Sequence, residues 1–336
     1  MRKLINDPFA VVDEMVDGLA TAFPTQIEVT PSRRGIVSTS RAESRQVGIV
    51  TGGGSGHEPA FFGYVGPGLA DGAALGNVFA SPSARPIVEV AERVHRGAGV
   101  VFLYGNYEGD VMNFELAGEL LEDRGIPSAH AVVTDDVASA PPEARERRRG
   151  VAGDVIVLKA AGAAADAGAS LEEVVGAAAH ANGRTRTAGV GLGPCTIPAA
   201  GVPTFELPEG LMDVGMGVHG EAGLVRRGLA PADEVADLLL ELVLGDLPLS
   251  DRPAVWAVVN TLGATPLMEG YVVLRRVGER LAALGIELAQ ALVGEYVTSL
   301  EMTGLSLTLA SLDDELAALL AAPAQALVMP PLRPPW

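Results

Sequence analysis

The sequence predicts an α/β fold in two domains, each a largely parallel or mixed sheet covered by helices. Short apolar runs rich in β-branched residues alternate with segments whose apolar residues recur at helical spacing, which is typical of helices packed over a sheet. The chain has 336 residues, and single cores stop growing at about 250–300 residues. A polar Asn182-Gly183 pair lies near its middle. We therefore place the domains at residues 1–182 and 183–336.

Strands and helices alternate along the first half of the chain. Strands are predicted at three short apolar runs, residues 47–51, 100–104 and 129–134. Helices are predicted at residues 82–96 and 110–124 and in the alanine-rich stretch 151–182. The helix at 110–124 is followed by Gly125, a natural C-cap residue.

The same alternation begins again in the second half. Strands are predicted at residues 188–192, 255–259, 286–293 and 305–309. Helices are predicted at residues 231–244, 266–284 and 313–320. Ligand sites in such sheets gather where strands end at their carboxyl edge, so the loops that follow these strands are the first places to look for function.

Composition excludes several classes of partner. The formal net charge is −18, which argues against nucleic acid or an anionic membrane surface as the main partner. No uninterrupted apolar stretch reaches the length of a membrane span, and the N-terminus turns polar too soon for a secretory signal. The single cysteine, Cys195, rules out an internal disulfide and fits a reducing compartment. We expect a soluble, cytoplasmic protein.

Two histidines, His57 and His219, lie among glycines. The first is in Thr51-Gly-Gly-Gly-Ser-Gly-His-Glu-Pro59 and the second in Gly215-Met-Gly-Val-His-Gly-Glu-Ala-Gly223. Flanking glycines leave an imidazole open to a small molecule and permit backbone angles closed to other residues. Either segment alone is also consistent with a tight turn and an incidental histidine. Together they favour a binding site.

The glycine run Gly52-Gly-Gly-Ser-Gly56 suggests a loop whose backbone amides cradle an oxyanion, because it follows a predicted strand. It matches neither common nucleotide-binding pattern, and the residue after the last glycine is histidine rather than lysine. The sequence therefore predicts a site for a small polar ligand without a nucleotide loop of its own.

Four further features each have two interpretations. Asp110 is either the N-cap of the helix that follows it or, with His57, half of an acid/base pair. Lys159 is either a Schiff-base lysine with a lowered pKa or a snorkelling lysine at the end of an element. Cys195 is either a nucleophile or a small buried filler. The arginine-rich stretch 140–150 is either a solvated surface loop or a phosphate contact.

Eight ordered motifs together resemble the substrate-binding K subunit or domain of the dihydroxyacetone kinase family, over nearly the whole chain. In the first half they are Lys3-Leu-Ile-Asn-Asp-Pro8, Gly52-Gly-Gly-Ser-Gly-His-Glu-Pro59, Asn106-Tyr-Glu-Gly-Asp-Val-Met-Asn-Phe114 and Arg148-Arg-Gly-Val-Ala152. In the second half they are Cys195-Thr-Ile-Pro-Ala-Ala-Gly201, Gly215-Met-Gly-Val-His-Gly-Glu221, Asn260-Thr-Leu-Gly-Ala-Thr-Pro266 and Thr298-Ser-Leu-Glu-Met-Thr-Gly304.

The resemblance implies a function for the glycine-flanked histidines. It assigns to His219 covalent addition to the ketone carbon of the substrate as a hemiaminal, which rejects glycerol and other polyols because they lack a carbonyl. It assigns acid/base roles to His57 and Asp110. It implies further substrate contacts from Gly54, Ser55 and Gly56. Glycerone kinase activity, within glycerol metabolism, is the reaction expected of the family.

The resemblance also implies partners. In this family a separate helical L subunit or domain binds the adenine nucleotide and magnesium, so we expect no cofactor and no metal on this chain. The chain ends at Trp336 without room for that domain, so we expect half of an enzyme. Its partner would hold ATP, or an ADP rephosphorylated by a phosphotransferase-system protein. We also expect a homodimer.

One departure from the family pattern bears on the substrate. Many members have a lysine that contacts the substrate at the position of Gly105, and a small hydroxyl residue at that of Glu108. We expect the missing lysine to widen the pocket, so that a four-carbon ketose such as erythrulose is an alternative to dihydroxyacetone. Two other functions stay open, namely a ligand-sensing regulator without catalysis and a Schiff-base lyase that uses Lys159.

Overall fold

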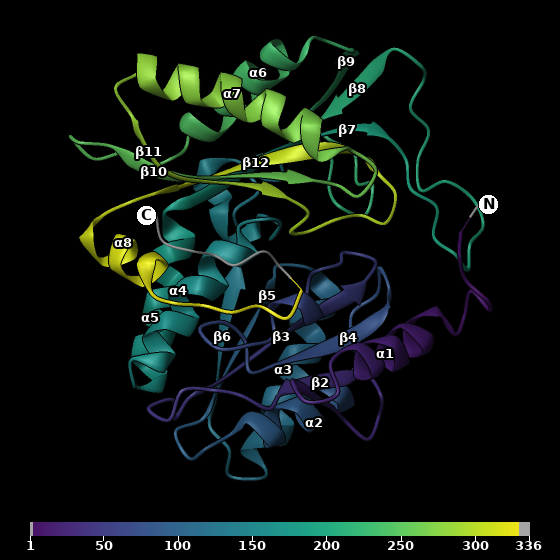
Figure 1. Cartoon of the computed structure of the whole chain (residues 1–336), viewed down its shortest axis with the longest axis vertical. Helices are drawn as coiled ribbons and strands as arrows, with labels where there is room; N and C mark the ends of the chain where they lie inside the picture. Colours follow the sequence, from purple (N-terminus) through teal and green to yellow (C-terminus); the bar gives the residue numbers. More distant parts are fainter. Residues whose placement is uncertain (1–2, 329–336) are drawn as a thin grey trace.

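Each half of the chain forms a six-stranded sheet in the computed structural model, which describes residues 3–328 (Figure 1). The first sheet has the strand order β1-β2-β4-β3-β5-β6. Its strands are β1 (Ile27–Val29), β2 (Gly35–Ser38), β3 (Gly48–Ser55), β4 (Gly72–Val78), β5 (Val100–Gly105) and β6 (Ser128–Val133). The four strands β4, β3, β5 and β6 run parallel, and β1 and β2 add an antiparallel edge.

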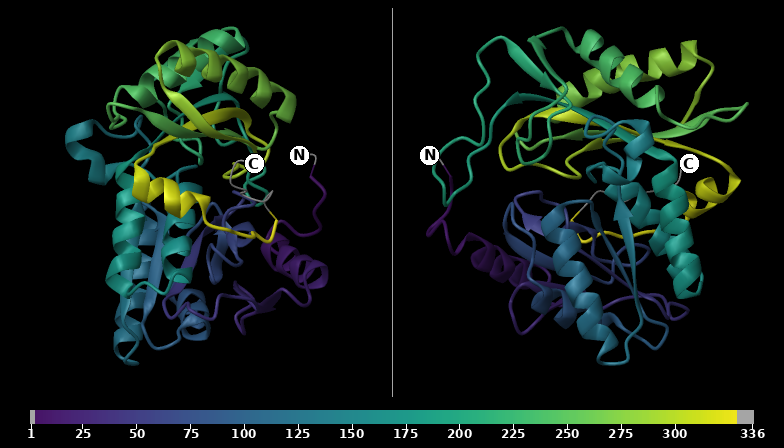
Figure 2. Two further views of the ribbon diagram at one scale, coloured as in Figure 1. Left: turned by 60° about the vertical axis from the view of Figure 1, so that its left-hand side comes forward. Right: turned by 180° about the vertical axis from the view of Figure 1, so that it is seen from behind.

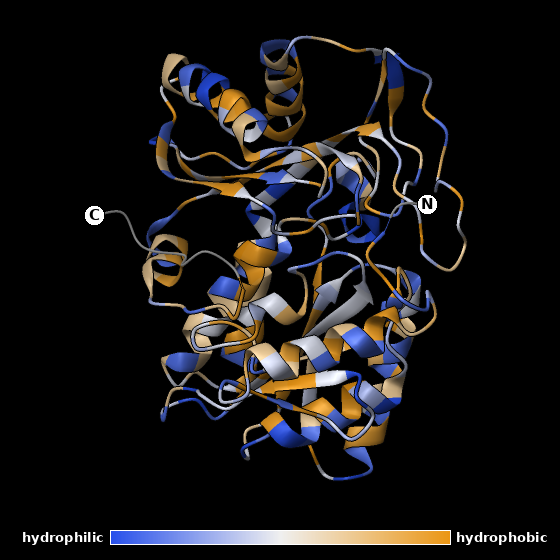
Figure 3. Ribbon diagram, turned by 45° about the vertical axis from the view of Figure 1, so that its right-hand side comes forward, coloured by the Kyte–Doolittle hydropathy of each residue, from blue (hydrophilic) through white to orange (hydrophobic). Residues whose placement is uncertain are grey.

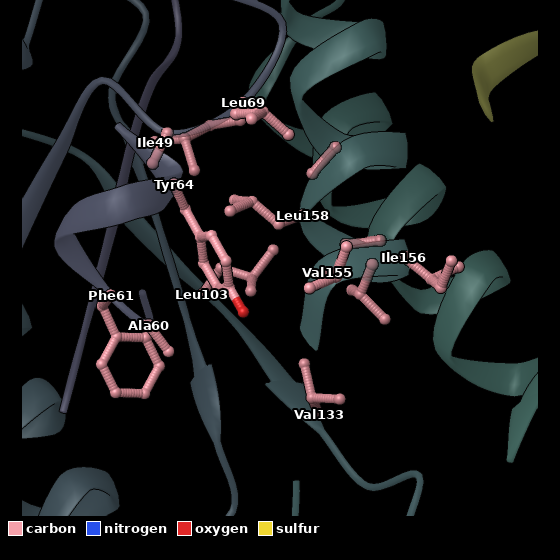
Figure 4. Packing of buried hydrophobic residues seen from close by; sticks show 14 of the residues in the cluster. Ile49, Ala60, Phe61, Tyr64, Leu69, Leu103, Val133, Val155, Ile156 and Leu158 are labelled. Carbon is pink, nitrogen blue, oxygen red and sulfur yellow. The ribbon is translucent and has the colours of Figure 1, made fainter. Parts of the chain in front are cut away.

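Helices cover both faces of the first sheet. α2 (Ala84–Val94) and α3 (Glu108–Glu122) pack on one face, and α4 (Asp154–Asp166) and α5 (Leu171–Gly183) pack on the other. The N-terminal α1 (Val11–Ala22) joins the core on the side of α4. Because both faces are buried, the central strands are apolar at successive positions. Figure 4 shows Val155 and Leu158 of α4 packed against this core.

The second sheet is mixed, with the order β11-β10-β12-β7-β8-β9. Its strands are β7 (Thr185–Gly193), β8 (Leu211–Val214), β9 (Val225–Gly228), β10 (Ala254–Thr261), β11 (Glu287–Gly294) and β12 (Thr303–Ser311). Within this sheet β10 and β11 pair in parallel, and the other neighbouring strands pair antiparallel.

One face of the second sheet is covered by helices and the other faces the first domain. α6 (Ala232–Leu244) and α7 (Leu267–Ala283) pack on the outer face (Figure 1). Trp256 and Val258, on the inner face, belong to the same core cluster as α4. α8 (Asp314–Ala321) returns from this sheet to α4 and α5, as both views in Figure 2 show. The helices carry hydrophilic and hydrophobic stripes (Figure 3).

The predicted fold class is confirmed, and each predicted strand and helix is present near its expected bounds. The chain crosses to the second sheet between Gly183 and Thr185. The sequence analysis missed α1, the seven-residue strand β4 and the short strands β1, β2, β8 and β9. None of the helices among residues 3–328 is both long enough and apolar enough to cross a membrane.

Candidate functional site

A small pocket lies where the two domains meet, at the carboxyl ends of β3 and β5. β3 has β4 as its neighbour on one side and β5 on the other. The strand order therefore reverses between β3 and β5, and ligand sites in open α/β sheets lie at such a point. The second domain contributes residues from the β8–β9 and β11–β12 loops. The pocket is lined by Gly53, Gly54, His57, Phe61, Gly105, Tyr107, Asp110, Gly150, Asp154, Val218, His219 and Val297.

The glycine run before His57 is a strand and not the loop predicted from the sequence. Gly52 and Gly53 pair with β4 as part of β3. Side chains are excluded there by close packing, since a Cβ on Gly52 would lie 2.5 Å from the Ala74 carbonyl oxygen and one on Gly53 would lie 2.3 Å from the Phe61 ring. Successive amides of a regular strand point in opposite directions, so Gly52 and Gly53, which pair within the sheet, do not form the predicted anion cradle.

The chain turns only at Gly56, where φ is +99°, in a region that favours glycine. This turn delivers His57 into the pocket, where the side chain is buried and its ring stacks on Phe79 at 4.8 Å between centroids. His57 Nδ1 donates to the Thr298 carbonyl, 2.8 Å away. Because a carbonyl only accepts, the proton sits on Nδ1 and Nε2 is free to accept. Burial, and then the neighbouring His219, lower the pKa of His57 to about 3.

His219 comes from the β8–β9 loop and is fixed by Glu221. The Glu221 carboxylate accepts from His219 Nδ1 at 3.1 Å and from the His219 backbone amide at 2.9 Å. Burial alone would raise the pKa of Glu221, but the hydrogen bond and charge of His219, with a smaller effect of Arg149, hold that pKa well below its usual range. Glu221 is therefore ionised, and the Nδ1 atom of His219 carries a proton.

The Nε2 atoms of His57 and His219 face each other at 3.1 Å. Both rings use Nδ1–H to donate to groups that only accept, so two neutral rings would present two lone pairs to each other. A hydrogen bond at this distance needs one further proton between them. Burial lowers the pKa of His57, so its Nε2 atom is the acceptor of this pair.

Arg149 ties the His219 loop to the first domain. Its guanidinium donates to Asp136 at 2.9 Å and to the Gly215 carbonyl at 3.1 Å, and it lies 3.8 Å from Glu221. The chain of charges Asp136–Arg149–Glu221–His219 therefore crosses from one domain to the other. Such a chain limits the orientations that the His219 ring can adopt.

Asp110 lies in the same pocket but is not an N-cap. The N-cap of α3 is Tyr107, and Asp110 is the third residue of the helix, so the capping interpretation is wrong. Burial raises the pKa of Asp110 to about 6, against smaller opposing effects of Ser81 and His219. Its Oδ1 atom is buried with no hydrogen-bond partner among residues 3–328. The oxygen is thus free to accept a proton from a ligand.

Gly105 lines the pocket, but the space beside it is partly filled. A Cβ added to Gly105 would lie 3.1 Å from the Gly150 carbonyl oxygen and 3.2 Å from the ring of Tyr107. The Tyr107 ring in turn meets the His219 ring edge-on, at 5.0 Å between centroids. The Tyr107 ring and the Gly150 backbone therefore take up part of the room beside Gly105, and the widening expected from the missing lysine stays a prediction.

Ser55 and Gly56 flank the pocket and do not line it. The Ser55 hydroxyl donates to the Gly76 carbonyl within the sheet, and the Gly56 amide donates to Glu58. Of the predicted substrate-contacting residues, the structure brings together Gly54, His57, Gly105, Asp110 and His219.

Three other candidates lie outside the pocket. Lys159 is buried in α4, so the snorkelling interpretation is wrong. Its Nζ atom donates to the Leu319 carbonyl of α8, and Lys159 does not line the pocket. Cys195 is the predicted buried filler, packed among Leu262 and Met302. In the stretch 140–150, the 3-10 turn Pro142–Arg147 is partly or fully exposed, but Arg148 is buried and donates to Asp246.

Sequence reasoning missed the residues that act on the histidines from outside the pocket. Thr298, Arg149 and Glu221 all lie in motifs that carried the family resemblance, but spacing in the chain does not reveal that Thr298 and Glu221 fix the two rings. Asp154 carried no signal, because an acidic residue at the start of a helix is common.

Residues 17–328 match the Dak1 domain family. The chain belongs to this family. A relative in Listeria innocua, named PTS-dependent dihydroxyacetone kinase 2, dihydroxyacetone-binding subunit DhaK, is 44% identical over 96% of this chain and 97% of its own length. The L-erythrulose kinase of Pectobacterium atrosepticum is 46% identical over 97% of this Dak1 chain, which spans 56% of the relative.

Solved structures agree with the fold. The dihydroxyacetone kinase from C. freundii in complex with AMP-PNP and Mg2+ has a TM-score of 0.90 at 28% identity, and the match covers all of this Dak1 chain and 62% of that one. The dihydroxyacetone kinase operon co-activator Dha-DhaQ has a TM-score of 0.86 at 31% identity, over 93% of this chain and 96% of its own.

Proposed function

We propose that this chain is the ketose-binding subunit of a dihydroxyacetone-type kinase and that it holds its substrate covalently on His219. The observation on which this rests is the pair of Nε2 atoms 3.1 Å apart, each with its Nδ1 fixed by an acceptor. The Nε2 atom of each ring therefore points toward the Nε2 atom of the other ring, inside a pocket that Asp110 also lines. This is the arrangement of a nucleophile beside its base.

The covalent step follows from that geometry. The His219 Nε2 proton passes to His57 Nε2, which frees the His219 lone pair to attack the ketone carbon. The carbonyl oxygen takes the proton back from His57 and becomes a hydroxyl. The single positive charge ends on the alkylated His219 ring, where Glu221 stabilises it. The pocket volume of about 20 Å³ is close to that of one water molecule, so the pocket must widen to take a ketose.

Phosphoryl transfer needs a base for the terminal hydroxyl of the bound ketose. Asp110 suits this role because its Oδ1 is unpartnered and its pKa of about 6 leaves it largely ionised at pH 7 while still able to take a proton. Asp110 would accept the hydroxyl proton as that oxygen takes up the phosphoryl group.

We place the nucleotide on a separate L subunit. The match to a named subunit over 97% of that relative's length supports this division. A phosphotransferase-system protein is a candidate source of the phosphoryl group, since the Listeria innocua relative is named PTS-dependent. A cytoplasmic homodimer is part of the same proposal.

Dihydroxyacetone and erythrulose are the two candidate ketoses. Relatives named for each are similar to this chain at nearly equal identity, 44% and 46%. Gly105 removes a cation from the pocket, but Tyr107 fills part of the space. We therefore propose that both ketoses are substrates.

A ligand-sensing regulator is the second candidate. The similarity to the co-activator Dha-DhaQ favours it. The free Oδ1 of Asp110 favours the kinase, because a sensor needs no base.

Reconstitution separates these candidates. The purified chain is mixed with an L subunit, Mg-ATP and either ketose, and ketose phosphate is measured. We expect turnover that requires both proteins and falls by a factor of about 10² or more in Asp110→Asn. If the chain binds ketose but no ketose phosphate forms with either ATP or a phosphotransferase donor, the result would indicate the regulator. Tight Mg-ATP binding by this chain alone would contradict the two-subunit arrangement.

A further inference from the structure

Asp154 is a second carboxyl group in the pocket that the proposed chemistry does not use. It is the first residue of α4, only 4% exposed, and lines the pocket with Asp110 and His219. Its Oδ1 atom is buried with no hydrogen-bond partner among residues 3–328. Buried polar atoms are almost always hydrogen-bonded, because leaving one unpaired is costly. An unpaired oxygen on a pocket wall therefore points to a group of the ligand.

Part of the wall of the pocket that Asp154 lines is built of two backbone segments in contact. A Cβ on Gly150 would lie 2.5 Å from the Cα of Gly105, and both glycines line the pocket. The Tyr107 ring lies against Gly105, so the pocket that Asp154 lines is narrow. A hydroxyl group on a small carbon skeleton fits such a space.

The protonation state of Asp154 differs from that of Asp110. Burial, and then the carboxyl groups of Asp135 and Asp110, raise the pKa of Asp154 well above its usual range. A neutral carboxyl group donates one hydrogen bond and also accepts. It cannot act as a base, so it does not suit the hydroxyl that must lose its proton during phosphorylation. It suits a hydroxyl that keeps its proton.

We propose that Asp154 determines substrate specificity by hydrogen bonding to the ketose hydroxyl that is not phosphorylated. This rests on the proposed function, since it assumes a ketose in this pocket. The class of substrate is then a short ketose with a hydroxyl group on each side of the carbonyl. Dihydroxyacetone and erythrulose both meet that condition. Hydroxyacetone, with a single hydroxyl, does not.

Calorimetry with two ligands and three proteins tests the proposal. The ligands are dihydroxyacetone and hydroxyacetone, and the proteins are the unaltered chain, Asp154→Leu and Asp154→Asn. We expect the unaltered chain to bind dihydroxyacetone about tenfold or more tighter than hydroxyacetone. Asp154→Leu should bind both ligands within about threefold of each other, and Asp154→Asn, whose amide also donates, should keep most of the preference.

Melting temperatures distinguish recognition from a structural role. Asp154→Leu removes an unpaired buried carboxyl, so we expect its melting temperature to rise by about 1–4 °C. A preference for dihydroxyacetone that persists in Asp154→Leu, or that is absent from the unaltered chain, would overturn this inference alone. If Asp154→Leu does not fold, full loss of the preference in folded Asp154→Asn would also overturn it, because the amide supplies the donor. Binding of neither ligand by the unaltered chain would overturn the proposed function and this inference with it.

Discussion

At the scale of single residues, Glu221 decides which nitrogen of His219 is free to react. Its carboxylate accepts from Nδ1 and from the backbone amide of the same histidine, so the ring is held by two bonds to one group. The negative charge of Glu221 also lies next to the His219 ring, which carries the positive charge in the proposed adduct. One side chain therefore controls the tautomer, the orientation and the charge balance of the nucleophile.

Glu221→Gln should keep the shape of this contact and remove its charge. We expect ketose phosphorylation by the reconstituted enzyme to fall by a factor of about 10–100, since charge-assisted hydrogen bonds are worth about 1.5–3 kcal/mol. The matched control is Glu209→Gln, an exposed carboxylate in the loop just before β8, which should leave the rate unchanged. Equal rates for Glu221→Gln and the control would contradict the role given to Glu221.

The pH dependence of kcat/KM should report Asp110. Its raised pKa of about 6 means that the base form is present above pH 6 and is lost below it, so the rate should fall about tenfold per pH unit below 6. The pKa of His57 is lowered to about 3, so His57 stays neutral through this range. The acid limb should disappear in Asp110→Asn and persist in His57→Asn. An unchanged acid limb in Asp110→Asn would show that another group titrates.

At the scale of elements, the sequence predicted the long strands and helices well because their pattern is strong. Residues 100–104 are apolar throughout, and the structure buries both faces of that strand. A short strand such as β1, with three residues, has too few positions to show such a pattern. It forms because β2 pairs with it. The glycine run 52–56 was misjudged because glycine is common in loops, whereas here it lets β3 pack against backbone and a phenylalanine ring.

The close packing of Gly52 within β3 leads to a prediction about stability. Gly52→Ala would place a Cβ 2.5 Å from a backbone oxygen of β4, which cannot move without breaking the sheet, so we expect a loss of about 1–3 kcal/mol in unfolding free energy. Gly176→Ala, in α5 with nothing within 4 Å, is the control and should stabilise the protein by up to about 1 kcal/mol. Urea unfolding of both variants measures the difference. A neutral Gly52→Ala would mean that this position is an open loop.

At the scale of the whole molecule, the site exists only when the two domains are together. His57 and Asp110 come from the first domain and His219 and Thr298 from the second. The sequence could indicate both histidines, because glycines flank each of them. It could not show that Thr298 fixes the His57 ring, because that contact depends on how the domains pack. Nor could it show that Glu221 fixes the His219 ring or that Asp154 lines the same pocket, because these depend on backbone geometry that the sequence pattern does not give.

Asp246 forms an ion pair with an arginine of each domain. It follows α6 and accepts from Arg148 of the first domain and Arg186 of β7, both nearly fully buried. Asp246→Asn leaves two buried guanidinium groups without a counter-charge, so we expect a loss of about 3 kcal/mol or more in unfolding free energy. Asp233→Asn breaks the exposed pair with Arg275 and should cost less than about 1 kcal/mol. Equal losses in thermal or urea unfolding would contradict this account of the domain contact.

The central claim is a covalent bond between His219 Nε2 and the ketone carbon. Carbon-13 NMR of dihydroxyacetone labelled at the carbonyl carbon, with saturating purified chain, tests it directly. We predict that the bound signal leaves the carbonyl region for that of a carbon bonded to both nitrogen and oxygen, that His219→Ala abolishes this signal, and that His57→Asn forms it more slowly. A bound ketose whose carbon stays in the carbonyl region, or the same adduct signal in His219→Ala, would contradict the claim.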